Sequence, residues 1–207
     1  MSEVNGINYI ITNNVNSSQK VSQKSKLGLY LIGTTGGIAT AISVICFPFI
    51  SPALRKICLP FVPATSQQIQ NVLKALEGRS GSLIDLGSGD GRIVFATAKA
   101  GFKAYGIELN LWLIWYSRLK ALITRSSLQT TFIKQNLWKH NLKRYNNIVL
   151  FGVDQMMKDI ETKFINELQE DCIIIACRFP LPTMTEIKII GEGNDTVWVY
   201  KISKKLQ

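Results

Sequence analysis

The chain has 207 residues, of which 46% are hydrophobic and 18% charged, and its formal net charge is +10. This length suits one ordinary domain with an appendage, and the hydrophobic content excludes a wholly disordered chain. The Lys and Arg residues are scattered, without a dense basic block, so no nucleic-acid-binding segment is expected. The charge favours an anionic surface only weakly.

The cysteines and the single histidine bear on metal binding. They are Cys46, Cys58, Cys172, Cys177 and His140. No C-x-x-C pair occurs, and one histidine does not complete a Cys/His zinc site. We therefore expect no metal site, and we expect reduced, mostly buried thiols.

Residues 1–26 are rich in Asn, Ser, Gln and Lys and contain few large apolar side chains. Such a segment buries too little surface to fold alone, so we expect a flexible polar tail. It contains Glu3 and no Arg, unlike the Arg-rich, acid-poor presequences that are cleaved in mitochondria. Lys20, Lys24 and Lys26 do precede an apolar run, but cleavage is not expected.

Residues 27–50 contain no charged side chain. At a rise of about 1.5 Å per residue, this stretch is long enough to cross a hydrocarbon core of roughly 30 Å. We predict a transmembrane, membrane-anchoring helix. Its glycines and Pro48 weaken a regular helix, so a buried core helix or a hairpin-like insertion is the alternative. Basic residues flank the segment on both sides and leave its orientation open.

The rest of the chain, residues 51–207, is expected to form one domain. Strand-like and helix-like runs alternate after residue 65, a pattern typical of an α/β architecture with helices on both faces of a sheet. Thr65 or Ser66 is expected to cap the first helix. The expected helices cover about 67–77, 92–100, 111–124 and 156–170, and the expected strands about 82–86, 104–108, 131–134, 148–152, 172–177 and 196–202.

A glycine-rich turn joins the first strand to the next helix. Its sequence is Asp85-Leu86-Gly87-Ser88-Gly89-Asp90-Gly91. The glycines let the backbone turn sharply and approach a ligand closely, which suits a nucleotide-like cofactor. A dinucleotide-binding fold requires G-x-G-x-x-G, but the position of the third glycine holds Arg92. A nicotinamide dehydrogenase is therefore the least favoured alternative.

An acidic residue followed by G-x-G-x-G resembles the first motif of the Rossmann-like class I methyltransferases. The resemblance implies S-adenosyl-L-methionine as cofactor, with the glycines beside its methionine part. Glu108 ends the next strand, where a carboxylate can accept both ribose hydroxyls. Asn136 follows the third strand, where these enzymes often place an Asp beside the adenine amino group, and an Asn can still hydrogen-bond there. The expected cofactor-binding residues are Asp85, Gly87, Ser88, Gly89, Asp90, Gly91, Glu108, Leu109, Asn110, Asn136 and Leu137.

Several further runs resemble a narrower family. They include Leu59-Pro60-Phe61-Val62-Pro63-Ala64-Thr65, residues 106–118, residues 151–157 and Cys177-Arg178-Phe179-Pro180. These runs are similar to the mitochondrial protein-lysine N-methyltransferases that modify the ATP synthase c subunit and the adenine nucleotide translocase. The c-subunit branch is the closer one, through residues 54–60 and 191–200. The resemblance implies trimethylation of a lysine in a small membrane protein and a location at the mitochondrial inner membrane.

Methyl transfer from a sulfonium is an in-line displacement, which needs a neutral lysine amine and the exclusion of water. Asp154 follows the fourth strand, where its carboxylate can receive the proton of the amine; the alternative is a helix N-cap. Loops after the carboxyl ends of strands form the ligand crevice of open α/β sheets. We therefore expect substrate-binding residues there, the alternative being simple capping and loop shaping, and they are Pro63, Thr65, Arg178, Phe179 and Pro180.

Trp112, Trp115 and Tyr116 fall at helical spacing on an apolar run. They are interpreted as core residues or membrane-interface anchors rather than as a cage for the lysine. Two other functions stay open for this chain. One is a membrane-bound assembly factor without transferase activity, and the other is a methyltransferase for a lipophilic small molecule such as a quinone.

Overall fold

The computed structural model of the chain describes residues 28–46 and 62–203. The chain divides into two units, residues 1–50 and residues 51–207. The expected polar tail of residues 1–26 lies outside the described residues. Residues 54–60, on which part of the family resemblance rests, and Cys58 also lie outside them.

The described part of the first unit is a helix, Gly28–Cys46, that is long and apolar enough to cross a membrane by length and composition. Its mean hydropathy is 1.7, and none of it is buried within the protein. The hydroxyl groups of Thr34, Thr35, Thr40 and Ser43 donate to backbone carbonyls three or four residues earlier. Its polar side chains are thus satisfied within the helix, as an apolar surrounding requires. The predicted helix is confirmed over this range.

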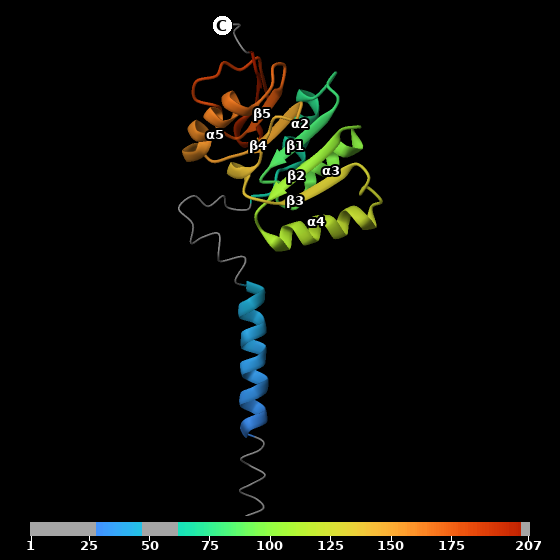
Figure 1. Ribbon diagram of the computed structural model, residues 1–207, viewed down its shortest axis with the longest axis vertical. Helices are drawn as coiled ribbons and strands as arrows, with labels where there is room; N and C mark the ends of the chain where they lie inside the picture. Colours follow the sequence, from blue (N-terminus) through green and yellow to red (C-terminus); the bar gives the residue numbers. More distant parts are fainter. Residues whose placement is uncertain (1–27, 47–61, 204–207) are drawn as a thin grey trace, which may run out of the picture. The chain divides into compact units, whose positions relative to one another are not determined.

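The second unit contains a seven-stranded sheet with the strand order β3-β2-β1-β4-β5-β7-β6 (Figure 1). Neighbouring strands from β3 to β5 pair in parallel, whereas β7 pairs antiparallel with both β5 and β6. The carboxyl ends of β1, β2 and β4 therefore lie along one edge of the sheet. The strands are β1 (Ser82–Leu86), β2 (Lys103–Glu108), β3 (Thr130–Lys134), β4 (Asn147–Phe151), β5 (Ile173–Cys177), β6 (Lys188–Ile190) and β7 (Val197–Lys201).

Helices cover both faces of this sheet. Successive side chains of a strand point to opposite faces, so alternate residues of each strand pack against different helices. On one face, strand residues such as Leu83 and Val149 pack with α2 (Ser66–Ala75). On the same face, α3 (Arg92–Lys99) and α4 (Leu111–Ile123) pack around Ala104 and Phe132. On the other face, the alternate strand residues pack with α5 (Asp154–Glu167). Burial on both faces explains the nearly continuous apolar runs of the central strands.

The expected elements agree with the observed ones within three residues at each end. Three short elements were not predicted, since three-residue segments carry almost no periodic signal. They are β6 and the 3₁₀ helices η2 (Leu137–Lys139) and η3 (Gly193–Asp195). The interpretation of Trp112, Trp115 and Tyr116 as core residues is wrong, because all three are exposed on α4.

The expectation of mostly buried thiols holds for Cys172 and Cys177 and is wrong for Cys46, which is exposed on the N-terminal helix. All three are free cysteines. Burial raises the pKa of the Cys172 thiol to about 12, so this group stays protonated and poorly nucleophilic.

Candidate cofactor and substrate site

The turn between β1 and α3 requires glycine at three positions. Gly87, Gly89 and Gly91 have φ angles of 85°, 53° and 78°. This left-handed region is readily adopted only by glycine. The N–H groups of Gly87 and Ser88 donate to the carbonyl of Ile107 at 2.9 and 2.8 Å, which fixes the turn against the end of β2.

Gly91 carries a second constraint, which makes it a sharp test of the turn. A Cβ at this position would lie 2.7 Å from a ring carbon of Phe132, whereas a Cβ at Gly78, with a similar φ of 75°, would meet no atom within 4 Å. Gly78→Ala should therefore lower the free energy of unfolding by about 1 kcal/mol, through backbone strain alone. Gly91→Ala should lower it by about 3 kcal/mol, because the clash with Phe132 adds to the strain. Urea unfolding of the detergent-solubilised chain measures both losses. Equal losses would mean that Phe132 moves aside freely.

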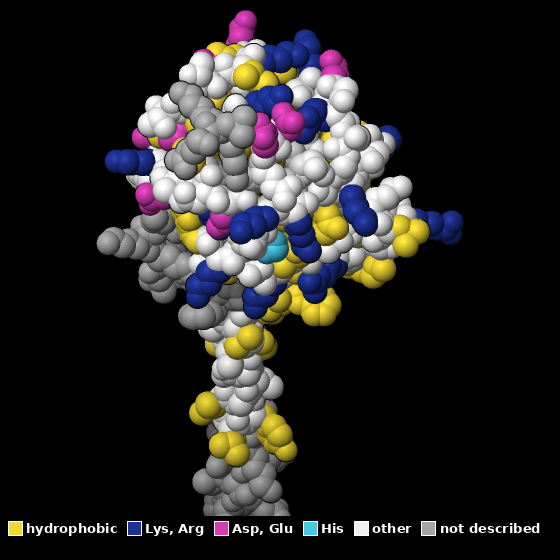
Figure 2. Space-filling model, turned by 45° about the horizontal axis from the view of Figure 1, so that its top comes forward, with side chains coloured by type: hydrophobic (Ala, Val, Ile, Leu, Met, Phe, Trp, Pro, Cys, Tyr) yellow, Lys and Arg dark blue, Asp and Glu magenta, His cyan; other side chains and the backbone are white. Residues whose placement is uncertain are grey.

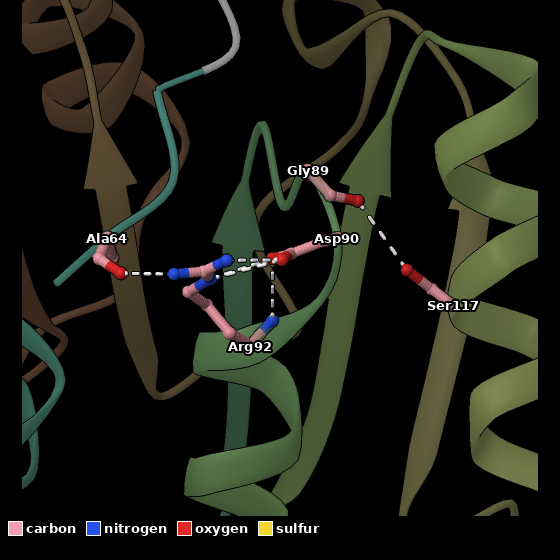
Figure 3. Close-up of polar contacts among 5 residues, drawn as sticks. All are labelled: Ala64, Gly89, Asp90, Arg92 and Ser117. Carbon is pink, nitrogen blue, oxygen red and sulfur yellow. Dashed lines mark hydrogen bonds and ion pairs between the residues drawn. The ribbon is translucent and has the colours of Figure 1, made fainter. Parts of the chain in front are cut away.

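Arg92 stands where a dinucleotide-binding fold has its third glycine, and it joins the turn to the segment before α2 (Figure 3). Its Nε lies 3.0 Å from Oδ1 of Asp90, and one terminal nitrogen lies 2.6 Å from Oδ2. The other terminal nitrogen donates to the carbonyl of Ala64 at 2.6 Å. Although partial burial acts to raise it, the Arg92 hydrogen bonds hold the pKa of Asp90 below its usual value. This link was not predicted, because an acid and a base two residues apart are only a weak signal in the sequence.

Helix α4 holds the turn from the opposite side (Figure 3). The hydroxyl of Ser117, which is fully buried, lies 3.5 Å from the carbonyl of Gly89. Gly106 of β2 lets the turn approach closely, because a Cβ there would lie 2.6 Å from Oγ of Ser88. The turn is therefore clamped between β2, α4 and the segment before α2.

Asp85, near the end of β1, is buried, with 2% of its surface exposed. Burial, together with the nearby carboxylates of Glu108 and Asp90, raises its pKa from 3.8 to about 8. Oδ1 of Asp85 and Oγ of Ser88 are buried and have no hydrogen-bond partner within residues 28–46 and 62–203. Buried polar atoms are normally satisfied, so this pair at one turn indicates a polar ligand group with hydrogen-bond donors.

Glu108 ends β2 and accepts three backbone hydrogen bonds. Its Oε2 accepts from the N–H of Gly89 at 3.1 Å, and its Oε1 accepts from Leu109 and Asn110 at 2.7 and 2.8 Å. An ionised carboxylate has about four acceptor positions, so capacity is left for a ligand hydroxyl. The carboxylate thus fixes the glycine turn and the start of α4 at the same time. Asn110 itself caps α4, since its Oδ1 accepts from the N–H of Trp112.

Asn136 follows β3 and caps the short helix η2, where its Oδ1 accepts from the N–H of Trp138 at 3.0 Å. An amide oxygen has two lone pairs, so one acceptor position is left for a ligand amine. Leu137 is partly buried against the main core. Both residues follow β3, which pairs with β2, so they lie at the edge of the sheet where Glu108 ends its strand.

The segment before α2 approaches the loop before β7. Oγ1 of Thr65 accepts from the N–H of Gln68 and donates to Oδ1 of Asp195 at 2.6 Å. The capping alternative for Thr65 is therefore confirmed, and a second contact is added to it. Asn71 of α2 donates to the carbonyl of Asp195 at 2.8 Å. Pro63 is exposed beside these residues.

Arg178 follows β5 with a φ angle of 72°, an uncommon value for a residue with a side chain. Its N–H donates to the carbonyl of Thr196, next to Asp195, and its guanidinium lies 5.4 Å from the centre of the Phe151 ring. Phe179 is partly buried against the core, and Pro180 is exposed. Arg178 and Thr65 therefore both contact the loop before β7, at Thr196 and Asp195.

Asp154 is exposed at the start of α5, and the alternative that it caps this helix is wrong. The N-cap is Val153, and Asp154 is the first helical residue. An acid in the first turn is favourable at the positive end of the helix dipole. Its position just after β4 keeps it at the edge of the sheet that carries the glycine turn.

The sheet order, the glycine turn and the carboxylate that ends β2 define a class I methyltransferase. Residues 85–188 match the family model "ANTKMT methyltransferase domain", and residues 24–55 match the model of the N-terminal domain of ATP synthase c-subunit lysine N-methyltransferases. The chain belongs to the family of ATP synthase c-subunit lysine N-methyltransferases.

Its similarity to curated relatives extends over most of the chain. It is 52% identical to the ATP synthase c-subunit lysine N-methyltransferase of Homo sapiens, over 87% of this chain and 78% of that protein. It is 36% identical to the adenine nucleotide translocase lysine N-methyltransferase of Mus musculus, over 87% of this chain and 81% of that protein. An RNA methyltransferase from Salinibacter ruber, solved with S-adenosyl-L-homocysteine, superposes with a TM-score of 0.65 at 21% identity. That likeness covers 70% of this chain and 97% of the other, and it concerns the fold alone.

Proposed function

We propose that the chain is an S-adenosyl-L-methionine-dependent protein-lysine N-methyltransferase that trimethylates a lysine of the ATP synthase c subunit. The observation that carries the chemistry is the clamped turn with Asp85 and Glu108 at its sides. The substrate follows from the relatives, which are named ATP synthase c-subunit lysine N-methyltransferases. The translocase is the second candidate substrate, because a relative named for it is 36% identical.

The charges at the turn fit this cofactor. The chain has a net charge of +10, yet three carboxyl groups, those of Asp85, Asp90 and Glu108, lie around the turn, and the latter two raise the pKa of Asp85. S-adenosyl-L-methionine supplies a methyl group on a positively charged sulfur. In the proposed site, Asp85 and Ser88 hold the amino-acid end, and the remaining acceptor position of Glu108 takes a ribose hydroxyl. The other contacts come from Gly87, Gly89, Gly91, Asp90, Leu109, Asn110, Asn136 and Leu137.

The proposed substrate side lies around the loop before β7. Pro63 and Thr65 border it from the segment before α2, and Arg178, Phe179 and Pro180 border it from the end of β5. The Arg92–Ala64 contact supports this arrangement, because it ties the Pro63–Thr65 segment to the cofactor turn. These groups orient the lysine and exclude water, and Asp154 receives the proton that the lysine ammonium must lose before it attacks.

Asp154 can be tested by substitution. Asp154→Asn should lower the turnover number by about 100-fold, the usual effect of removing a proton acceptor, with little change in cofactor affinity. The loss should shrink as the pH rises, because the lysine amine then loses its proton to solvent. Asp159→Asn, an exposed change on the same helix, is the control. Full turnover of Asp154→Asn with unchanged cofactor affinity would show that Asp154 only stabilises the start of α5.

We also propose that residues 27–50 anchor the chain in the mitochondrial inner membrane. The apolar helix Gly28–Cys46 and the match of residues 24–55 to the N-terminal domain of the family support this location. An anchored enzyme meets a substrate confined to the same bilayer at a high effective concentration.

Intact-mass analysis of membrane proteolipids, with and without the protein, tests the proposed function. We expect a gain of three methyl groups on the c subunit, which requires an active transferase. A gain on the translocase alone would favour the second substrate. Radiolabel from the cofactor that enters the lipid extract would favour a quinone-like substrate, and no methylation at all would favour an inactive assembly factor.

A further inference from the structure

Helix α4 packs one narrow face against the protein and exposes large apolar side chains on its outer face. Its buried residues are Ile114, Ser117 and Ala121, which pack toward β2 and β3. The outer face of α4 consists of six large side chains that are between 40% and 73% exposed, namely Trp112, Trp115, Tyr116, Leu119, Leu122 and Ile123. These positions recur at helical spacing, so they form one continuous stripe.

This stripe is unusual for a surface helix, whose outer face is normally polar. Contiguous exposed apolar surface of this kind marks an interaction site. Leu109 before α4 and Leu128 after it, 39% and 93% exposed, extend the stripe at both ends. Figure 2 shows hydrophobic side chains gathered at the lower right of the folded domain, with Lys and Arg side chains beside them.

The charged residues of α4 and of the chain that follows it are all basic up to residue 153. Residues 109–153 contain seven Lys or Arg and no Asp or Glu. Arg118 and Lys120 border the stripe on its two sides, and Arg125 follows it. The ammonium of Lys120 lies 5.7 Å from the centre of the Tyr116 ring, so it stays close to the apolar face. The face therefore complements an anionic apolar surface.

We propose that the outer face of α4 docks onto an anionic lipid bilayer and orients the catalytic domain on the membrane. Tryptophan, tyrosine and leucine rimmed by Lys and Arg are the side chains that enter the interface between lipid headgroups and acyl chains. Juxtamembrane basic residues add attraction to anionic headgroups. The proposal rests on the anchoring by residues 27–50, which keeps the domain near the bilayer so that a weak second contact is sufficient.

Docking through α4 has a consequence for the cofactor site. The start of α4 is fixed by Glu108 and Asn110, and its inner face reaches Gly89 through Ser117. The glycine turn therefore sits against the inner side of a helix whose outer side lies on the lipid. This arrangement places the site at a defined height above the membrane surface, where a lysine of a small membrane protein is presented.

Tryptophan quenching by brominated lipids tests the proposal on the full chain. The chain is reconstituted into vesicles of phosphatidylcholine and phosphatidylglycerol, with or without brominated acyl chains. We expect strong quenching in the brominated vesicles, and loss of that quenching in Trp112→Phe with Trp115→Phe, which keeps the face apolar but removes the reporters. Quenching should weaken in phosphatidylcholine alone and at high salt.

Negative charges placed on the outer face of α4 should prevent it from docking onto the bilayer. Leu119→Glu with Leu122→Glu should abolish the α4 quenching, while Ile165→Glu with Ile187→Glu, exposed apolar positions elsewhere, should leave it unchanged. Quenching that survives the first pair of substitutions overturns the proposal. Unquenched tryptophans with a blue-shifted emission also overturn it, because they indicate a second copy or another protein on the face.

Vesicle flotation and proteolipid mass separate this proposal from those on which it rests. All variants should float with the vesicles, because the N-terminal helix is unchanged. A wild-type chain that does not float contradicts the anchoring and, with it, the docking. Flotation without α4 quenching contradicts the docking alone, and the absence of a methyl gain on the c subunit, with flotation and quenching intact, contradicts only the proposed substrate.

Discussion

Asp85→Asn should stabilise the cofactor-free protein by about 2–4 kcal/mol at pH 8. A shift of the pKa from 3.8 to about 8 corresponds to a cost on the order of 5 kcal/mol for keeping this carboxylate ionised in the folded state. The isosteric amide removes that cost, but its own unsatisfied hydrogen bonds reduce the gain in stability by about 1–3 kcal/mol. Urea unfolding of the detergent-solubilised chain measures the difference, with Asp159→Asn as the exposed control.

The pH dependence of this effect has a definite sign. Between about pH 4 and pH 8 the folded protein holds a proton on Asp85 that the unfolded chain has released. The free energy of unfolding of the wild type should therefore fall as the pH rises through this window and level off above it. The Asn variant should lack this component. A variant that is less stable than the wild type at pH 8 would mean that the folded protein satisfies the ionised carboxylate.

The same substitution should weaken cofactor binding. An ammonium group of the ligand favours the ionised form of Asp85, so binding below about pH 8 should release a proton in the wild type and none in the variant. Loss of one hydrogen bond to a charged group costs about 2 kcal/mol, or roughly 30-fold in affinity. Calorimetry with S-adenosyl-L-homocysteine in two buffers of different ionisation enthalpy measures the affinity and the number of protons released. Stability gained at the expense of binding is typical of functional sites.

The sequence was sufficient for the fold and for the cofactor turn, for a common reason. The central strands are buried on both faces, so they appear as short apolar runs such as residues 148–152 and 172–177, each bounded by turn residues. The turn is specified locally, since Gly87, Gly89 and Gly91 all have positive φ. Signals that arise within a few neighbouring residues can be read without a structure.

Features that depend on residues distant in the sequence could not be predicted. The contact of Arg92 with Ala64 and that of Thr65 with Asp195 join segments 28 and 130 residues apart. The orientation of Trp112, Trp115 and Tyr116 was left open between the core and the membrane interface, because helical periodicity defines a face without saying which face meets the sheet. The face of α4 that meets the sheet is the one that carries Ser117, whose buried hydroxyl reaches the carbonyl of Gly89.

Glu108→Gln should reduce cofactor affinity by about 100-fold while leaving the fold intact. The carboxylate accepts three backbone N–H groups, and in the proposed site its remaining acceptor position takes a ribose hydroxyl. An amide has one accepting oxygen, so its NH₂ group must face either the N–H of Gly89 or those of Leu109 and Asn110. Replacing charge-assisted hydrogen bonds by fewer neutral ones corresponds to about 3 kcal/mol.

The distinction that matters for Glu108 is between holding the turn and binding the ligand. A purely structural role would lower the melting temperature and the turnover number together, and saturating cofactor would not restore activity. A ligand-binding role should raise the KM for the cofactor and leave turnover at saturation within about threefold of the wild type, since uniform binding is what is lost. Glu170→Gln, an exposed change, should alter neither quantity. Unchanged cofactor affinity in Glu108→Gln would remove the carboxylate from the binding site and leave it only as the residue that fixes the turn to β2.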